Sequence, residues 1–94
     1  MPDKLMALQL VKTRLNRAQA DTTLDEYLVA RIDAAEGELK KTGITLTDSA
    51  EDMMLLVDYT VWQYQNRDKA AGMPEWLRQR LRDRWLQQKR GDNA

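Results

Sequence analysis

Apolar residues recur every three or four positions along most of the chain, which is the spacing of helices that bury one face. The first such stretch contains Leu5, Leu8, Val11 and Leu15. Asp3 stands directly before it, where a carboxylate can accept hydrogen bonds from the first free backbone N–H groups of a helix. The pattern predicts a helix over residues 4–17.

The second stretch has the most regular periodicity, because its apolar residues fall within one arc when each residue turns the helix by about 100°. These residues are Leu24, Tyr27, Leu28, Ile32, Ala35 and Leu39. Thr23 and Glu26 have the spacing of a capping box at its start, and Gly43 can form a left-handed cap after its end. We therefore expect a core-facing helix over residues 24–41.

A third helix is expected over residues 49–70, with Asp48 and Glu51 as its capping box. One apolar face contains Met53, Val57, Val61 and Tyr64, and another contains Leu55, Tyr59 and Trp62. A helix that is apolar nearly all round is buried nearly all round. Because the chain has few other helices to cover it, we expect the second of these faces to contact another subunit.

The helical pattern is interrupted by Gly72 and Pro74, and Pro74 is well suited to the first position of a new helix. A narrow apolar stripe follows, made of Leu77, Leu81 and Trp85. It predicts a fourth helix over residues 74–88.

Together these stretches predict an all-α fold, a small bundle of about four helices with short loops, in one domain over residues 1–88. The polar segment 89–94 is expected to be a disordered tail. A chain of 94 residues buries only about 60–65% of the surface that it exposes when unfolded. An isolated subunit would therefore be marginally stable, and an oligomeric partner would help to stabilise it.

The chain contains neither His nor Cys, so the commonest general base, the commonest metal ligand and any disulfide or thiolate are missing. The carboxylates of Asp48, Glu51 and Asp52 could in principle hold a hard cation. Their spacing is instead that of a helix N-terminus, without the alternating ligands and central glycine of a calcium loop. We expect no enzymatic activity, no cofactor and no metal site.

Charge is balanced overall, with 15 basic and 15 acidic residues, but it is uneven along the chain. Residues 1–58 contain 7 basic and 11 acidic side chains, whereas residues 59–94 contain 8 basic and 4 acidic ones. Such a polar molecule suits head-to-tail packing of identical subunits, or an acidic partner at one end.

The predicted last helix carries four alternating arginines between two tryptophans: Trp76, Arg78, Arg80, Arg82, Arg84 and Trp85. A step of two residues turns a helix by about 200°, so these arginines form two ridges and not one patch. Two ridges beside an apolar stripe favour contacts with subunits or with another protein. The alternative is a small helical DNA-binding or regulatory protein that uses this Arg-rich helix.

Arg31 falls inside the apolar arc of the second predicted helix, between Tyr27 and Ala35. A charge in that place needs a partner, or its side chain must reach solvent. We expect a salt bridge to an acid of the third helix such as Asp58, within or between subunits, or else a guanidinium that extends to the surface.

The run Val61-Trp62-Gln63-Tyr64-Gln65-Asn66-Arg67-Asp68, followed by Gly72-Met73-Pro74, resembles the head–tail connector proteins of long-tailed double-stranded DNA phages and prophages. In that family a buried helix ends in Tyr-x-Asn-Arg before a break and a last segment, and Tyr64, Asn66 and Arg67 match this signature. Residues 11–15 and 24–43 are similar to the family's opening element and next helix. The likeness covers about residues 8–83, although the loop between the first two helices is shorter here and the last helix richer in arginine.

The resemblance implies a structural virion assembly protein that forms a ring under the portal, extends the DNA channel and offers a platform to the next neck or tail protein. Its partners would be further copies of itself, the portal protein and that downstream protein, with DNA only passing through and no membrane. It would lie in the virion neck, after assembly in the host cytoplasm.

Two roles remain open for the signature residues. Tyr64, Asn66 and Arg67 could close the end of the third helix, with Asn66 bonding the backbone and Arg67 pairing with a carboxylate. They could instead contact a partner directly. We favour the first role.

Overall fold

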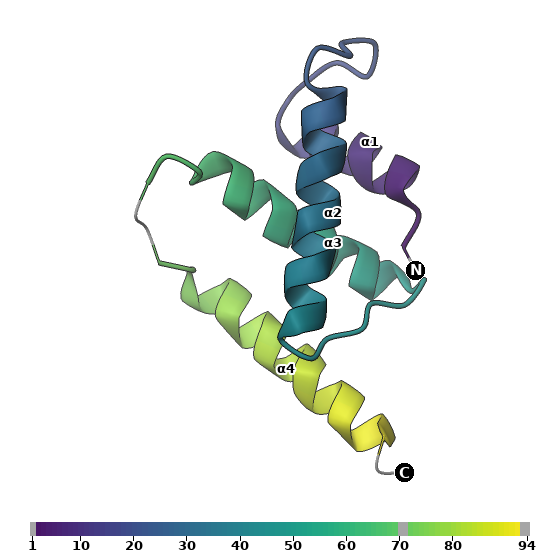
Figure 1. The fold of residues 1–94 in the computed structure, drawn as a ribbon, viewed down its shortest axis with the longest axis vertical. Coiled ribbons are helices and arrows are strands. Elements are labelled where there is room, and N and C mark those ends of the chain that lie inside the picture. The colour runs from purple at the N-terminus through teal and green to yellow at the C-terminus, as the bar shows by residue number, and fades with distance from the viewer. Residues whose placement is uncertain (1, 70–71, 93–94) are drawn as a thin grey trace.

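The computed structural model describes residues 2–69 and 72–92, which form four helices. These are α1 (Lys4–Arg14), α2 (Asp25–Lys41), α3 (Ala50–Gln65) and α4 (Glu75–Asp92). The described residues contain no strand, and Figure 1 shows the four helices packed together. The predicted all-α fold is confirmed.

α1 begins as predicted and ends earlier. The Asp3 carboxylate accepts hydrogen bonds from the backbone N–H groups of Leu5 and Met6, at 3.0 and 3.4 Å. Asn16 adopts a φ of 58°, a left-handed conformation through which a helix cannot continue and which Asn tolerates better than most residues. The predicted continuation to residue 17 is wrong for this reason.

α2 begins without the capping box expected from Thr23 and Glu26. Leu24 occupies the N-cap position and makes no side-chain cap. The backbone N–H of Thr23 donates instead to the Asp21 carboxylate at 3.1 Å. The acidic first turn, which contains Asp25 and Glu26, still favours the positive end of the helix dipole.

The end of α2 has the predicted glycine cap. Gly43 has a φ of 97°, and its N–H and that of Ile44 donate to the carbonyls of Lys40 and Leu39, at 3.0 and 2.9 Å. This is the Schellman arrangement. The positive φ favours glycine here, and a Cβ at this position would also crowd Trp85, because it would lie 3.0 Å from Nε1 of that ring.

α3 is capped one residue later than expected. The Ser49 hydroxyl accepts the Asp52 N–H at 3.1 Å, so the proposed Asp48–Glu51 box is wrong. α3 ends at Gln65, with Asn66 in the C-cap position. The predicted continuation towards residue 70 is therefore wrong as well.

α4 continues to Asp92, so the prediction of a disordered tail is wrong for residues 89–92; residues 93–94 lie outside the described part of the chain. Lys89 and Arg90 favour the negative end of the helix dipole. The Lys89 ammonium also lies 5.4 Å from the centre of the Trp85 ring. These interactions stabilise a last turn that contributes little apolar area.

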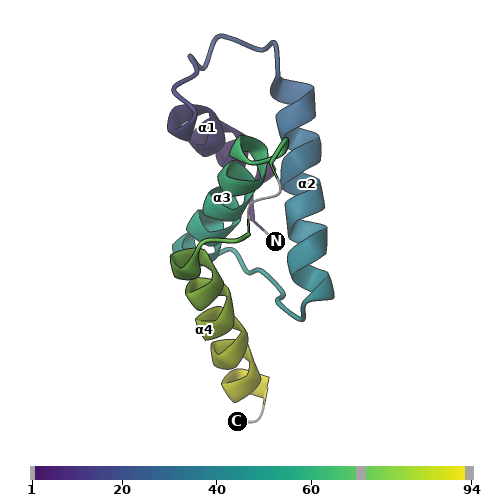
Figure 2. The same cartoon turned by 90° about the vertical axis from the view of Figure 1, so that its left-hand side faces the viewer.

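The core lies around α3, which packs against each of the other helices. Buried side chains come from every helix and from the α2–α3 link: Ala7, Leu8, Val11, Leu28, Ile32, Ala35, Leu39, Ile44, Leu46, Met53, Leu55, Leu56, Val57, Tyr59, Val61 and Leu77. Figure 2 shows α1, α2 and α3 in one body, with α4 leading away from it. Of the three other helices, α4 packs against α3 alone.

Candidate assembly surface

The signature residues lie at the C-terminal end of α3, where the last carbonyls of a helix need donors. The Asn66 side-chain amide donates to the carbonyl of Trp62 at 2.8 Å. The Arg67 guanidinium donates to the carbonyl of Tyr64 and lies over the Tyr64 ring, 4.1 Å from its centre. The Asn66 side chain thus hydrogen-bonds a backbone carbonyl, as expected. Among the described residues Arg67 pairs with no carboxylate, so that part of the expectation is wrong for the subunit.

Arg31 is bound to its own helix and not to α3. Its Nε donates to the Tyr27 hydroxyl at 2.9 Å, and its guanidinium lies 5.5 Å from the centre of that ring. Tyr27 meets Tyr64 edge to face, with 6.0 Å between ring centres. Arg31 and Arg67 are therefore held on the two rings of one aromatic pair that joins α2 to the end of α3.

The expected salt bridge from Arg31 to Asp58 does not form within the subunit. Asp58 is paired with Arg14 of α1 and with Arg80 of α4. Its side chain is 12% exposed, so two guanidinium groups satisfy a carboxylate that is largely out of solvent. The Arg31 guanidinium instead extends to the surface, which was the second of the two expectations.

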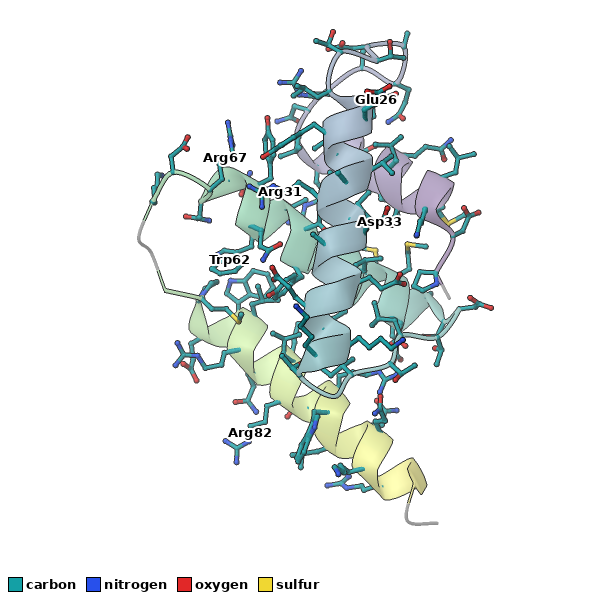
Figure 3. The ribbon with its side chains drawn as sticks, viewed as in Figure 1. Glu26, Arg31, Asp33, Trp62, Arg67 and Arg82 are labelled. Carbon is teal, nitrogen blue, oxygen red and sulfur yellow. The ribbon has the colours of Figure 1, made fainter. Side chains whose placement is uncertain are left out.

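A shallow hollow of about 230 Å³ lies between α2 and the end of α3. We call it the basic hollow; it is lined by Arg31, Trp62, Gln63, Asn66, Arg67 and Lys69. Three of these residues are cationic and none is acidic. Figure 3 shows Arg31, Trp62 and Arg67 on the same side of α2.

The arginines of α4 lie on two ridges with different surroundings. Arg80 pairs with Asp58, and Arg84 pairs with Asp52 through bonds of 2.7 and 3.0 Å. Both acids belong to α3, so this ridge fixes α4 to the rest of the subunit. The charges of both arginines are therefore paired within the subunit, although the Arg80 side chain is 38% exposed and that of Arg84 15% exposed.

The other α4 ridge and the two tryptophans are exposed. Arg78 and Arg82 face solvent, and the contact from Arg78 to Glu75 is long, at 3.8 Å. Trp76 is 51% exposed and Trp85 37% exposed. Of the α4 residues expected at an interface, Trp76, Arg78 and Arg82 are thus exposed, and Trp85 is exposed beside them.

Asp52 has a role that the sequence did not reveal. It is buried, and it accepts hydrogen bonds from the Thr47 N–H and hydroxyl at 2.7 and 2.8 Å as well as from Arg84. Burial alone would raise the pKa of Asp52, but the bonds from Arg84 and Thr47 outweigh it and lower the pKa. The Ser49-x-x-Asp52 spacing was the available signal that Ser49 caps the helix and that Asp52 lies in its first turn. This spacing could not predict the bond from Asp52 to Arg84 of α4.

The second apolar face of α3 is covered within the subunit. Leu55 is 3% exposed and Tyr59 is 8% exposed, because α2 and α4 pack on this helix. The Tyr59 hydroxyl donates to Glu38 of α2 at 2.8 Å. These two residues therefore offer no surface to another subunit, contrary to expectation, whereas Trp62 is only half-buried and lines the basic hollow.

Lys12 is a buried cation that sequence reasoning missed as a structural residue. Its ammonium contacts the Asp25 carboxylate and the Gln19 carbonyl, both at 2.9 Å. Through these contacts Lys12 joins α1 to the α1–α2 loop and to the start of α2. The residue is only 2% exposed, so the connection lies inside the protein. Its place next to Val11 on the apolar face of α1 was the only signal.

Within residues 2–69 and 72–92, no cluster of three or more acidic side chains is placed to hold a metal ion. None of the helices formed by these residues is long and apolar enough to span a bilayer. Comparisons of the chain with protein-family models, with curated proteins and with solved structures find no match.

Proposed function

We propose that this chain is a non-enzymatic, ring-forming head–tail connector of a long-tailed double-stranded DNA phage or prophage. It would join the portal vertex to the next neck or tail protein and extend the channel through which DNA passes. The proposal is supported by the resemblance of residues 8–83 to that family, including Tyr64, Asn66 and Arg67. Its location would be the virion neck, after assembly in the host cytoplasm.

The observation that supports an assembly role best is the amount of apolar surface left exposed on so small a chain. Exposed large apolar side chains occur on all four helices: Leu5, Met6, Tyr27, Met54, Trp76, Trp85 and Leu86. Tryptophan and tyrosine are enriched among the residues that dominate protein interfaces. A subunit that contacts several further copies of itself and several neighbouring proteins would have such residues on several faces.

DNA binding through α4 is the alternative function, and the outward ridge of Arg78 and Arg82 beside Trp76 and Trp85 is the observation that favours it. The opposite ridge weakens it, because Arg80 and Arg84 are neutralised by acids of α3. DNA affinity depends largely on the number of phosphates that cations neutralise. Two of the four α4 arginines therefore already pair with carboxylates inside the subunit.

Electron microscopy of the purified protein, together with a DNA-binding titration at two salt concentrations, separates these functions. A connector gives annular particles with a central opening and little affinity for duplex DNA. A DNA-binding protein gives a monomer or dimer whose affinity for DNA falls steeply with salt. The second result would overturn the proposal.

A further inference from the structure

The two arginines of the basic hollow have no acidic partner within the described chain. Each guanidinium has five N–H donors, and the bonds of Arg31 to Tyr27 and of Arg67 to the Tyr64 carbonyl use one apiece. The aromatic pair holds both groups in place. Several fixed donors therefore remain for an anionic group that enters the hollow.

The opposite side of α2 carries exposed carboxylates. Arg31 and Asp33 are two residues apart, so they point about 200° away from each other on the helix, and Figure 3 shows them on opposite sides of α2. Glu26 lies seven residues before Asp33 and shares its face. We call Glu26 and Asp33, with the small residue Ala30 between them, the acidic stripe; all three are exposed.

The acidic stripe is accessible to a partner. A Cβ placed on Gly37, the next residue along this face, would meet no atom within 4 Å. Asp33 does pair with Lys4 at 2.5 Å, but both side chains are nearly half exposed. A surface ion pair of this kind contributes little free energy, so Asp33 can accept a better placed donor.

From these two surfaces we infer that the basic hollow of one subunit binds the acidic stripe of the next copy of the chain. This inference rests on the ring-forming function proposed above and names the contact that would build the ring. Rings need two different, complementary surfaces on each subunit, which meet head to tail. The hollow and the stripe are complementary in charge and lie on opposite sides of α2, while the chain as a whole is neutral.

Half-buried Trp62 gives the hollow an apolar wall beside its cations. Aromatic residues and arginine are among the side chains that are enriched in protein interfaces. A nucleic acid or a free anion would contact the cations of the hollow alone and would make no use of the acidic stripe. A second copy uses both surfaces.

The test uses two full-length variants and their mixture. The first, Arg31→Glu with Arg67→Glu, makes the hollow acidic and keeps the stripe. The second, Glu26→Arg with Asp33→Arg, makes the stripe basic and keeps the hollow. We expect each variant alone to need at least about a tenfold higher concentration than the natural chain to assemble, because like charges would meet at every contact.

Mixing the two variants in equal amounts should restore assembly, because each altered surface then meets an oppositely charged one on the other variant. The mass is measured by light scattering. Circular dichroism checks that each variant keeps its helices, and Arg90→Glu is the matched control for an exposed cation that lies outside the hollow, the stripe and the outer ridge of α4.

Three results would count against these proposals in different ways. If either double variant assembles as the natural chain does, or if the mixture remains monomeric, the hollow–stripe contact is wrong while ring formation stands. If the natural chain itself is monomeric at every concentration, the proposed function fails and the contact fails with it.

Discussion

At the scale of single residues, Asp52 is the carboxylate whose removal should affect the subunit most. It is 2% exposed and is bonded to Arg84 and Thr47. Asp52→Asn would keep the shape of the side chain but would leave the Arg84 guanidinium without its counter-charge. We expect a loss of about 2–3 kcal/mol in the free energy of unfolding at neutral pH, measured by urea denaturation.

The same residue gives a pH dependence with a defined sign. Because the folded-state pKa of Asp52 is lowered from 3.8, its contribution is complete above the unfolded pKa and is lost as the pH falls through the folded value. The difference between the natural chain and Asp52→Asn should therefore disappear in strong acid. Glu51→Gln, on an exposed carboxylate in the same turn, is the control. Equal stability of the natural chain and Asp52→Asn at neutral pH would contradict this assignment.

Tyr59 should ionise only at strongly alkaline pH in the folded chain. Burial, followed by the hydrogen bond to Glu38 and the charge of that carboxylate, raises the pKa of Tyr59 from 10.0 to about 12. A raised pKa adds stability that is complete below the unfolded pKa and is lost as the pH rises through the folded one. Ultraviolet titration of the tyrosinate, with Tyr59→Phe for comparison, should show a step near pH 12 that the variant lacks. A variant with an unchanged titration curve would refute this.

At the scale of helices, α4 is attached by one fully buried apolar side chain, by ion pairs with α3 and by hydrogen bonds between Gln88 and the α2–α3 link. Among the α4 side chains that the structure describes, Leu77 alone is 0% exposed, and Arg80 and Arg84 supply the ion pairs. Leu77→Ala should cost about 2–4 kcal/mol of unfolding free energy. It should also increase amide hydrogen exchange in α4 more than in α2.

The matched control for this prediction is Leu86→Ala, on the same helix but 36% exposed. It should change stability by less than about 1 kcal/mol. If both substitutions destabilised the chain equally, Leu77 would not be the apolar attachment of α4.

The helices themselves were predictable because the apolar residues follow a helical period. The Gly43 cap was predictable because glycine readily adopts the left-handed backbone conformation that ends many helices. The helix ends were less predictable. Asn16, Ser49 and Asn66 end or begin helices through backbone conformation and single hydrogen bonds, which several neighbouring polar residues could equally have supplied. The last turn of α4 was missed since its support, from Lys89 on Trp85, is not apolar periodicity.

The candidate surface was only partly predictable for a related reason. Periodicity placed Leu55 and Tyr59 on a separate face of the third helix but could not show that α2 and α4 would cover it. The two arginine ridges followed from helical geometry, whereas the choice of Asp52 and Asp58 as partners of one ridge depends on tertiary packing. The Arg31–Tyr27–Tyr64–Arg67 arrangement joins two helices, and no spacing within one helix predicts it.

At the scale of the whole molecule, part of the charge asymmetry along the chain is cancelled inside the fold. Arg80 and Arg84, from the basic half, pair with Asp58 and Asp52, from the acidic half. The basic hollow, the acidic stripe and the outer ridge of α4 are among the charged surfaces that remain exposed. Association through these exposed groups should therefore respond to salt more than the fold does.

Raising the salt concentration from low to several-fold above physiological should thus weaken assembly by about tenfold, because screening shortens the range of exposed charges. The melting temperature of the subunit should change little, since Asp52 and Arg84 are largely out of solvent. Light scattering and calorimetry at the same salt concentrations measure the two effects. Assembly that strengthens with salt would indicate an apolar interface instead.

The central claim is that this chain builds a closed ring from identical subunits. The most direct test is the mass of the purified protein by native mass spectrometry across a range of concentrations. A ring predicts one dominant assembly whose mass is a fixed multiple of the 11.0 kDa chain and whose population rises with concentration. A species of 11.0 kDa at every concentration, or an open-ended ladder of masses, would contradict it.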